Sequence, residues 1–128
     1  MRPLTLAAFL LLAGSAAGIP MGFALSQATS QMRVEIVLQR VVSEIPQPTK
    51  LQVHDDRWDP GAETSMHEHP GPVILAVIEG ELVEETPDGQ TTLRAGRVFW
   101  RAAHQMHNVK NVSGKPARVL AIHFDPIQ

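Results

Sequence analysis

The chain has 128 residues, of which 44% are hydrophobic and 19% charged, so it can form one domain with a modest core but not two large domains. Its net charge of -2 argues against the basic surface that binding to nucleic acid requires. Cysteine is absent, which excludes a disulfide framework, a thiolate metal site and a cysteine nucleophile.

The N-terminal segment has the pattern of a targeting sequence. Arg2 precedes an uncharged, mainly apolar run over residues 4–17, and the small residues 15–18 suit cleavage by a signal peptidase. A later cut after Ala24 is compatible with the same pattern. We therefore predict that residues 1–24 are a signal peptide of an exported, periplasmic bacterial protein.

An uncleaved membrane anchor is the alternative for the same segment. Residues 3–25 are apolar over about the 20 residues that span a bilayer, although Gly14 and Pro20 weaken a long helix. Either alternative places the folded part outside the cytoplasm. Residues 26–32 are small and polar, which indicates a linker over residues 25–32, and we expect the folded domain to occupy residues 33–128.

Downstream of the linker, the chain has the pattern of short β-strands. Runs rich in β-branched and aromatic residues alternate with glycine and proline turns, and Pro87-Asp88-Gly89 is a strong hairpin signal. The pattern predicts an all-β sandwich or barrel with roughly eight or nine strands. The clearest of them are residues 33–44, 51–54, 73–78, 81–85, 91–93, 98–100, 107–112 and 117–124. A helical period also fits residues 33–44, but their β-branched side chains favour a strand.

A His-x-His pair, His67 and His69, lies in the middle of the chain. In an extended strand residues i and i+2 point to the same side, so both imidazoles can reach one point. Such a pair is half of a metal site. The C-terminal half of the chain offers His104, His107 and His123 to complete it, and three imidazoles suit a divalent first-row metal.

The glycines around these histidines make the chain resemble the cupin superfamily. The first cupin motif is Gly, five residues, His-x-His, three or four residues, Glu, six residues, Gly. The second is Gly, five residues, Pro-x-Gly, two residues, His, three residues, Asn. The matching positions are Gly61, His67, His69 and Gly80 in the first motif, and Gly96, His107 and Asn111 in the second. The resemblance covers residues 50–124 and is more specific for fold than for function.

The resemblance implies a small jelly-roll β-barrel in which His67, His69 and His107 bind the metal. The family's fourth ligand, a glutamate, is replaced by Val73, or by Ile74 on the longer spacing. Three neutral imidazoles leave the cation its full charge and one more open position. Such a site favours anionic, chelating ligands such as an enolate, a catecholate or an α-hydroxy acid. Other acids in reach of the motif are Glu63, Glu68, Glu79 and Glu81, and none of them is favoured as a substitute ligand.

His104 stands where the second motif has its inner glycine, and histidine tolerates the positive φ that such a turn needs. It also precedes Asn108 by four residues, so it competes with His107 as the ligand of the second motif. The distance from Gly96 favours His107. We keep His104 as the candidate acid or base near the metal.

Further polar residues have simpler expected roles. His123 is predicted to be a hydrogen-bonded strand histidine and His54 a solvated one. Asn111 is expected to hold a turn or to form a hydrogen bond to a metal-binding side chain, not to bind the metal itself. Trp100 is expected to pack in the core. Arg101 is either a solvated charge or a group that binds a substrate carboxylate.

Three-His cupins include several non-haem iron dioxygenases, so the first functional hypothesis is a dioxygenase-like enzyme with Fe(II) and a small anionic chelating substrate. Mn, Ni, Zn and Cu remain alternative metals. The cysteine dioxygenase branch does not match, because its Tyr and Cys are absent from this chain. The second hypothesis is a non-catalytic metal- or ligand-binding module of the periplasm, and a weaker third is a metal-dependent isomerase or lyase. By analogy with cupins, we expect a homodimer formed through residues 33–42.

Overall fold

The computed structural model describes residues 31–127. The predicted signal peptide or anchor, and most of the predicted linker, lie outside these residues. Every regular element in the described part of the chain is a β-strand, which confirms the all-β class. Among residues 31–127 there is no helix with the length and apolar character that crossing a bilayer requires.

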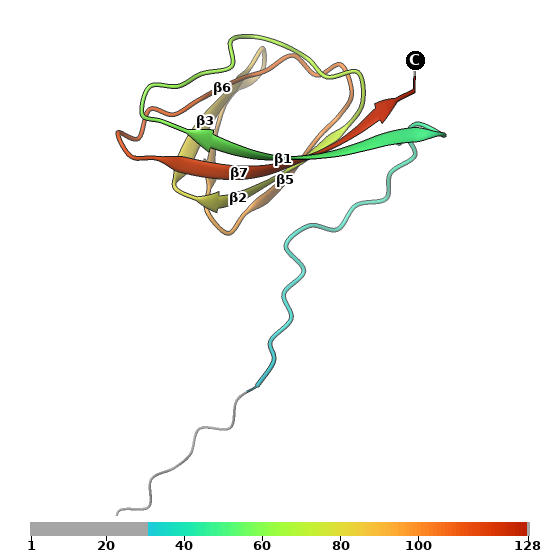
Figure 1. Ribbon diagram of the computed structural model, residues 1–128, viewed down its shortest axis with the longest axis horizontal. Coiled ribbons are helices and arrows are strands. Elements are labelled where there is room, and N and C mark those ends of the chain that lie inside the picture. The colour runs from blue at the N-terminus through green and yellow to red at the C-terminus, as the bar shows by residue number, and fades with distance from the viewer. Residues whose placement is uncertain (1–30, 128) are drawn as a thin grey trace, which may run out of the picture. The chain divides into compact units, whose positions relative to one another are not determined.

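The described strands form two antiparallel sheets that face each other, as Figure 1 shows. One sheet has the order β1-β7-β2-β5 and the other β4-β3-β6. This is the predicted jelly-roll architecture. The strands are β1 (Thr49–Trp58), β2 (Val73–Glu79), β3 (Glu81–Thr86), β4 (Gly89–Arg94), β5 (Val98–Arg101), β6 (Asn108–Lys110) and β7 (Ala117–Pro126).

The predicted strand over residues 33–44 is wrong, because the first strand begins at Thr49. Val34 is 78% exposed and Val41 fully exposed, so their side chains are not packed as in a sheet. Alternating β-branched residues raise strand propensity, but a strand also needs a neighbour to accept its hydrogen bonds. Residues 40–44 instead reach Trp100 on β5, whose indole Nε1 donates to Glu44 Oε1 at 2.9 Å.

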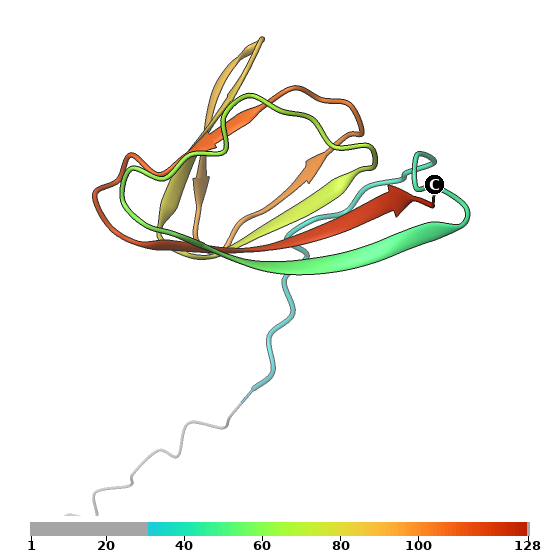
Figure 2. The same cartoon turned by 45° about the horizontal axis from the view of Figure 1, so that its top comes forward.

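β1 and β7 are the longest strands and pair along their whole length, from Thr49 opposite Pro126 to Trp58 opposite Ala117. β7 also pairs with β2, so it is one of the two inner strands of its sheet. In Figure 2 the two long strands, β1 and β7, lie side by side along the lower side of the barrel, and the β3–β4 hairpin lies at the top. The inner faces of β1 and β7 therefore line the interior side by side.

The hydrophobic core occupies the space between the sheets near one end of β7. Its buried residues are Val77, Leu82, Leu93, Val109, Ala117 and Val119, with Trp58, Leu75 and Phe99 packed against them. Leu82 and Leu93, which are each 1% exposed, face each other across the β3–β4 pair. Burial of these side chains is the main stabilising contribution at this end of the barrel.

Two glycines are required where backbone segments meet closely. Gly80 has a φ of 76°, and a Cβ there would overlap the carbonyl oxygen of Pro116. Gly71 has ordinary backbone angles, but a Cβ there would overlap the carbonyl of Phe124 on β7. Gly71 thus lets the segment that carries His67 and His69 lie directly against β7.

Candidate metal centre

The candidate site lies where two loops form a narrow antiparallel pair. The backbone N–H of His67 donates to the carbonyl of His107 at 2.9 Å, and the N–H of His107 returns a bond to His67 at 2.8 Å. The pairing continues as Thr64 N–H donates to Val109 O at 3.0 Å. Two histidines that are 40 positions apart in the sequence are thereby held opposite each other.

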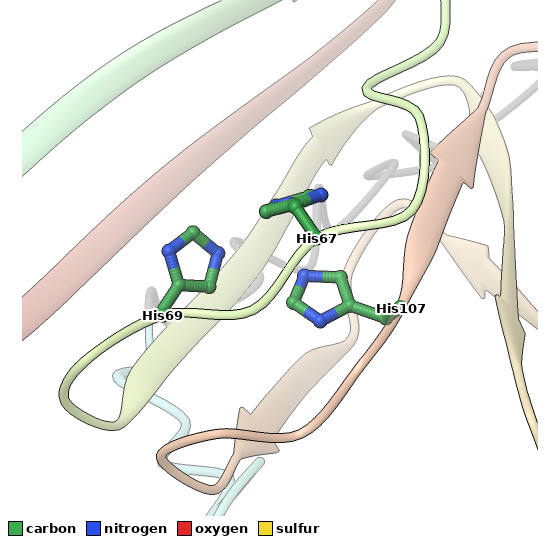
Figure 3. A group of neighbouring side chains, drawn as sticks. All are labelled: His67, His69 and His107. Carbon is green, nitrogen blue, oxygen red and sulfur yellow. The ribbon is translucent and has the colours of Figure 1, made fainter.

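The imidazoles of His67, His69 and His107 converge on one point, as Figure 3 shows. One nitrogen from each ring lies within 4.8 Å of the other two. The ring centroids are 4.9 Å apart for His67 and His69, 4.4 Å for His67 and His107, and 5.2 Å for His69 and His107. His107 is 3% exposed, and the other two rings are half-buried. Three converging nitrogen donors fit a divalent first-row metal ion.

Two of the three imidazoles are held by backbone carbonyls on the side away from this point. His67 Nδ1 donates to Ser65 O at 2.9 Å, and His107 Nδ1 donates to Gln105 O at 2.8 Å. A proton on Nδ1 leaves the lone pair on Nε2, the form that binds metal. Each bond reaches back two residues, so the local chain sets both tautomers. His69 makes no hydrogen bond of this kind within the described residues.

His69 is kept neutral by its surroundings. Burial, the largest cause, and the neighbouring His123, His107 and His67 together lower the pKa of His69 to about 4, although Asp125 opposes them. Desolvation disfavours the charged form of a buried imidazole. At neutral pH the ring therefore carries a free lone pair, which metal binding requires.

The three imidazoles open into a cavity of about 340 Å³. Burial of His123 lowers its pKa, and it contacts His54 at 4.4 Å and His69 at 4.9 Å between ring centroids. Apart from the triad, the cavity is lined by Gln52, His54, Asp56, Trp58, Thr64, Leu75, Val109, Ala121, His123 and Asp125.

The role predicted for His123 needs correction. His123 is buried, but its side chain has no hydrogen-bond partner in the described residues and faces the cavity. His54 is exposed to solvent, as predicted, and its side chain also lines the cavity. The sequence patterns did not identify four further cavity residues, which are Gln52, Asp56, Trp58 and Asp125. The period-two pattern of residues 52–58 could have shown that they share a face, but not which face turns inward.

His104 does not line the cavity. Its side chain is 67% exposed and its Nδ1 lies 3.2 Å from Glu68 Oε1, on the outer side of the loops. The geometry therefore gives no support to its predicted role as the acid or base beside the metal. The predicted turn conformation is confirmed, because His104 has a φ of 60°.

The position of the missing carboxylate is occupied by an apolar side chain. Val73 is 1% exposed and, by strand alternation, faces inward with Leu75, which lines the cavity. No acid joins the three histidines within the described residues. Glu63 accepts a hydrogen bond from Asn108 at 3.2 Å, and Glu68 pairs with His104, so both are engaged elsewhere.

Arg101 and Asn111 have structural partners. Arg101 forms a two-pronged ion pair with Glu84, and the two side chains are only 12% and 2% exposed, respectively. The guanidinium is therefore not free to bind a substrate carboxylate. Asn111 is fully buried and holds its turn, as predicted, by donating to Lys115 O at 2.7 Å and accepting from Ser113 Oγ at 2.8 Å.

Comparison with known proteins agrees with this fold. Residues 56–123 match the family model described as cupin domain. A cupin domain from Bordetella pertussis Tohama I is 31% identical, with a TM-score of 0.52 over 59% of this chain and 81% of that one. A protein with a double-stranded β-helix domain from Klebsiella pneumoniae is 27% identical, with a TM-score of 0.52 over 56% of this chain and 64% of that one.

A cupin superfamily protein from Desulfitobacterium hafniense DCB-2 extends the similarity over more of the chain. It covers 75% of this chain and 84% of its own, with a TM-score of 0.55 and 20% identity, which shows the fold alone. No curated protein is significantly similar in sequence to this chain.

Proposed function

Because the chain belongs to the cupin domain family and its three imidazoles converge, we propose that His67, His69 and His107 bind one divalent metal ion, with Fe(II) favoured. The convergence of the three rings, two of them held by Nδ1 bonds to carbonyls, is the observation that carries this proposal. We further propose that the protein is a dioxygenase-like enzyme that acts on a small anionic chelating substrate.

The absence of a fourth protein ligand supports the choice of an anionic substrate. Three neutral imidazoles do not reduce the charge of a bound cation, and Val73 adds neither charge nor a donor atom beside them. The metal, when bound, would supply Lewis-acid and redox chemistry and orient its ligands. A substrate that arrives as its anion needs no general base, which agrees with the exposed position of His104.

The chain's own residues would bind and enclose the substrate. Leu75, Val109 and Ala121 form an apolar part of the cavity next to the triad, which limits water around the reacting group. Trp58, the last residue of β1, also lines the cavity. These side chains orient a ligand by shape, while the triad holds its chelating end.

The test has two steps. Metal analysis of the purified mature protein should show about one ion per chain, lost in the His67→Ala/His107→Ala variant. Oxygen consumption by the Fe(II)-loaded protein is then measured with enolate, catecholate and flavonoid substrates. A folded, metal-free protein would contradict the metal site. Tight metal binding without oxygen uptake would favour the non-catalytic binding module, and substrate conversion without oxygen uptake would favour an isomerase or lyase.

Export and dimerisation are proposed on sequence grounds. The uncharged run over residues 4–17 supports export to the periplasm, and N-terminal sequencing of the mature protein tests cleavage near Ala24. The exposed apolar side chains of Val34, Ile36 and Val41 support a homodimer formed through this segment. Light scattering of the intact chain and of a Val34→Ser/Ile36→Ser variant tests it, with a shift to monomer expected in the variant.

A further inference from the structure

Besides the triad, the cavity has a second polar surface, which includes two carboxylates. It consists of Gln52, His54 and Asp56 on β1 with His123 and Asp125 on β7, and we call it the β1–β7 wall. Alternate residues of each strand contribute, and Gln52 lies directly opposite His123 in the register. Barrel interiors of this size are ordinarily filled by apolar side chains, so a polar inner face needs an explanation.

The side chains of the β1–β7 wall have no hydrogen-bond or ion-pair partner within residues 31–127. The outer face of the same two strands behaves differently. There Arg118 Nε donates to Asp55 Oδ1 at 2.7 Å, and Arg57 to Asp55 Oδ2 at 3.1 Å. Polar groups on the outer face are thus paired with one another, whereas those on the inner face are left available to a ligand.

Two buried side-chain atoms in the described part of the chain lack a partner, Asp125 Oδ1 and Trp58 Nε1, and both residues line this cavity. A buried polar group without a partner is destabilising by about 1–3 kcal/mol. Both atoms lie at the same cavity, so a polar ligand bound there could form hydrogen bonds with them.

The wall adjoins the triad. The ring of His123 lies 4.9 Å from that of His69 and 4.4 Å from that of His54, so the imidazoles form a continuous row from the triad to β1. The cavity volume of about 340 Å³ lies in the range typical of small-molecule sites. One small ligand can therefore contact the triad at one end and the wall at the other.

The charge of the β1–β7 wall indicates which chemical groups of a ligand it can bind. Asp56 and Asp125 are the charged residues in the cavity lining, and no lysine or arginine of the described chain is among them. A second anionic group would be repelled. Carboxylates accept hydrogen bonds, and a neutral imidazole or an amide both donates and accepts, which suits hydroxyl groups.

We propose that the β1–β7 wall binds the hydroxyl groups of a small polyhydroxy carboxylate whose carboxylate end chelates the metal at the triad. This proposal rests on the proposed metal site for the position of the carboxylate, but the wall itself can be tested without metal. Gln52 and Asp56 would be specificity-determining residues, since they touch the distal hydroxyls and not the metal.

The test compares two α-hydroxy acids of equal length by calorimetry on the full mature chain. Gluconate carries distal hydroxyls and 2-hydroxyhexanoate does not, while their chelating groups are the same. With metal-loaded protein we expect gluconate to bind at least about tenfold more tightly, because it adds several hydrogen bonds. The Gln52→Ala/Asp56→Ala variant should lose this preference and keep its affinity for 2-hydroxyhexanoate. The control Asp55→Ala, one position away on the outer face, should keep the preference.

Equal or tighter binding of 2-hydroxyhexanoate to the unmodified protein would overturn the proposal, as would a gluconate preference that survives in the Gln52→Ala/Asp56→Ala variant. The same titrations on metal-free protein separate the two proposals. If the protein binds no metal but still prefers gluconate, only the metal site fails. If neither acid binds with or without metal, the wall is not a binding site.

Discussion

The two ends of the barrel interior are built from the same strands but filled with different side chains. On β7, Ala117 and Val119 belong to the hydrophobic core, while His123 and Asp125, on the same face, line the cavity. One end is close-packed and apolar, and the other contains the cavity, which has polar side chains on its β1–β7 wall. The packed core and the proposed binding site thus lie toward different ends of one sheet.

This separation has a physical basis. Burying apolar side chains contributes about 25 cal/mol per Å² of surface removed from water, so the closed end can stabilise the whole barrel. Unpaired polar groups at the open end oppose folding until a metal or ligand provides partners. Substitutions at the open end should therefore change binding far more than stability, and those at the closed end the reverse.

The largest effect is expected from removing the triad. The His67→Ala/His107→Ala variant should lose metal affinity by more than about a thousandfold, because one imidazole cannot replace three converging donors. Calorimetric metal titration measures the loss. The far-ultraviolet circular dichroism of the variant should stay that of the parent, since both side chains lie at the open end. Retained metal affinity would contradict the assignment of the site.

The buried ion pair should give the largest change in stability. Glu84→Ala leaves the guanidinium of Arg101 buried without its partner, so we expect a loss of about 3–5 kcal/mol in the free energy of unfolding, measured by urea denaturation. The matched control is Glu81→Ala in the same strand, whose partner Arg94 is 67% exposed. That control should change stability by about 0–1 kcal/mol.

The closed end is tested by shortening a core side chain. Leu82→Ala should lower the free energy of unfolding by about 3 kcal/mol, because Leu82 is 1% exposed and its loss leaves a cavity. Leu51→Ala, at a residue 60% exposed, should stay within about 0.5 kcal/mol. Metal affinity at 25 °C should be unchanged in both. A large loss of metal affinity in folded Leu82→Ala protein would show that the two ends are coupled.

The pH dependence of the metal-free protein tests the burial of the open end. The folded protein holds the pKa of His69 at about 4, below the ordinary value of 6.5, so the unfolded chain binds a proton first as the pH falls. The free energy of unfolding should therefore be unaffected by this group above pH 6.5 and decrease from pH 6.5 to about 4. Urea denaturation across this window measures the slope. His69→Gln should make the slope shallower, and an unchanged slope would show that His69 does not contribute.

The smallest effect is expected at His104. His104→Gly should relieve backbone strain, because glycine adopts the φ of 60° found there without cost. The same substitution removes an exposed contact with Glu68. The two effects are small and opposite, so the free energy of unfolding should change by less than about 1 kcal/mol. Metal affinity should not change. If the Fe(II)-loaded protein consumes oxygen, a more than tenfold fall in the rate for this variant would restore His104 as an acid or base, against its exposed position.

The features that depend on local spacing could be predicted from the order of the residues. Strand periodicity and turn residues predicted an all-β fold, and the motif distances selected His67, His69 and His107, whose rings the structure brings together. The positive φ of His104 was also predictable, because it follows from a motif position that prefers glycine. These features depend on neighbours within a few residues, so they can be read along the chain.

The set of polar residues that share the cavity depends on long-range strand pairing. Even the paired residues of β1 and β7 that lie nearest in the sequence, Trp58 and Ala117, are 59 positions apart, yet the two strands pair over their whole length. That pairing brings His54 next to His123 and turns both inward, which alternation alone could not specify. The same reason explains the failure of the predicted strand over residues 33–44. Strand propensity is local, whereas a sheet forms only where a distant partner strand is available.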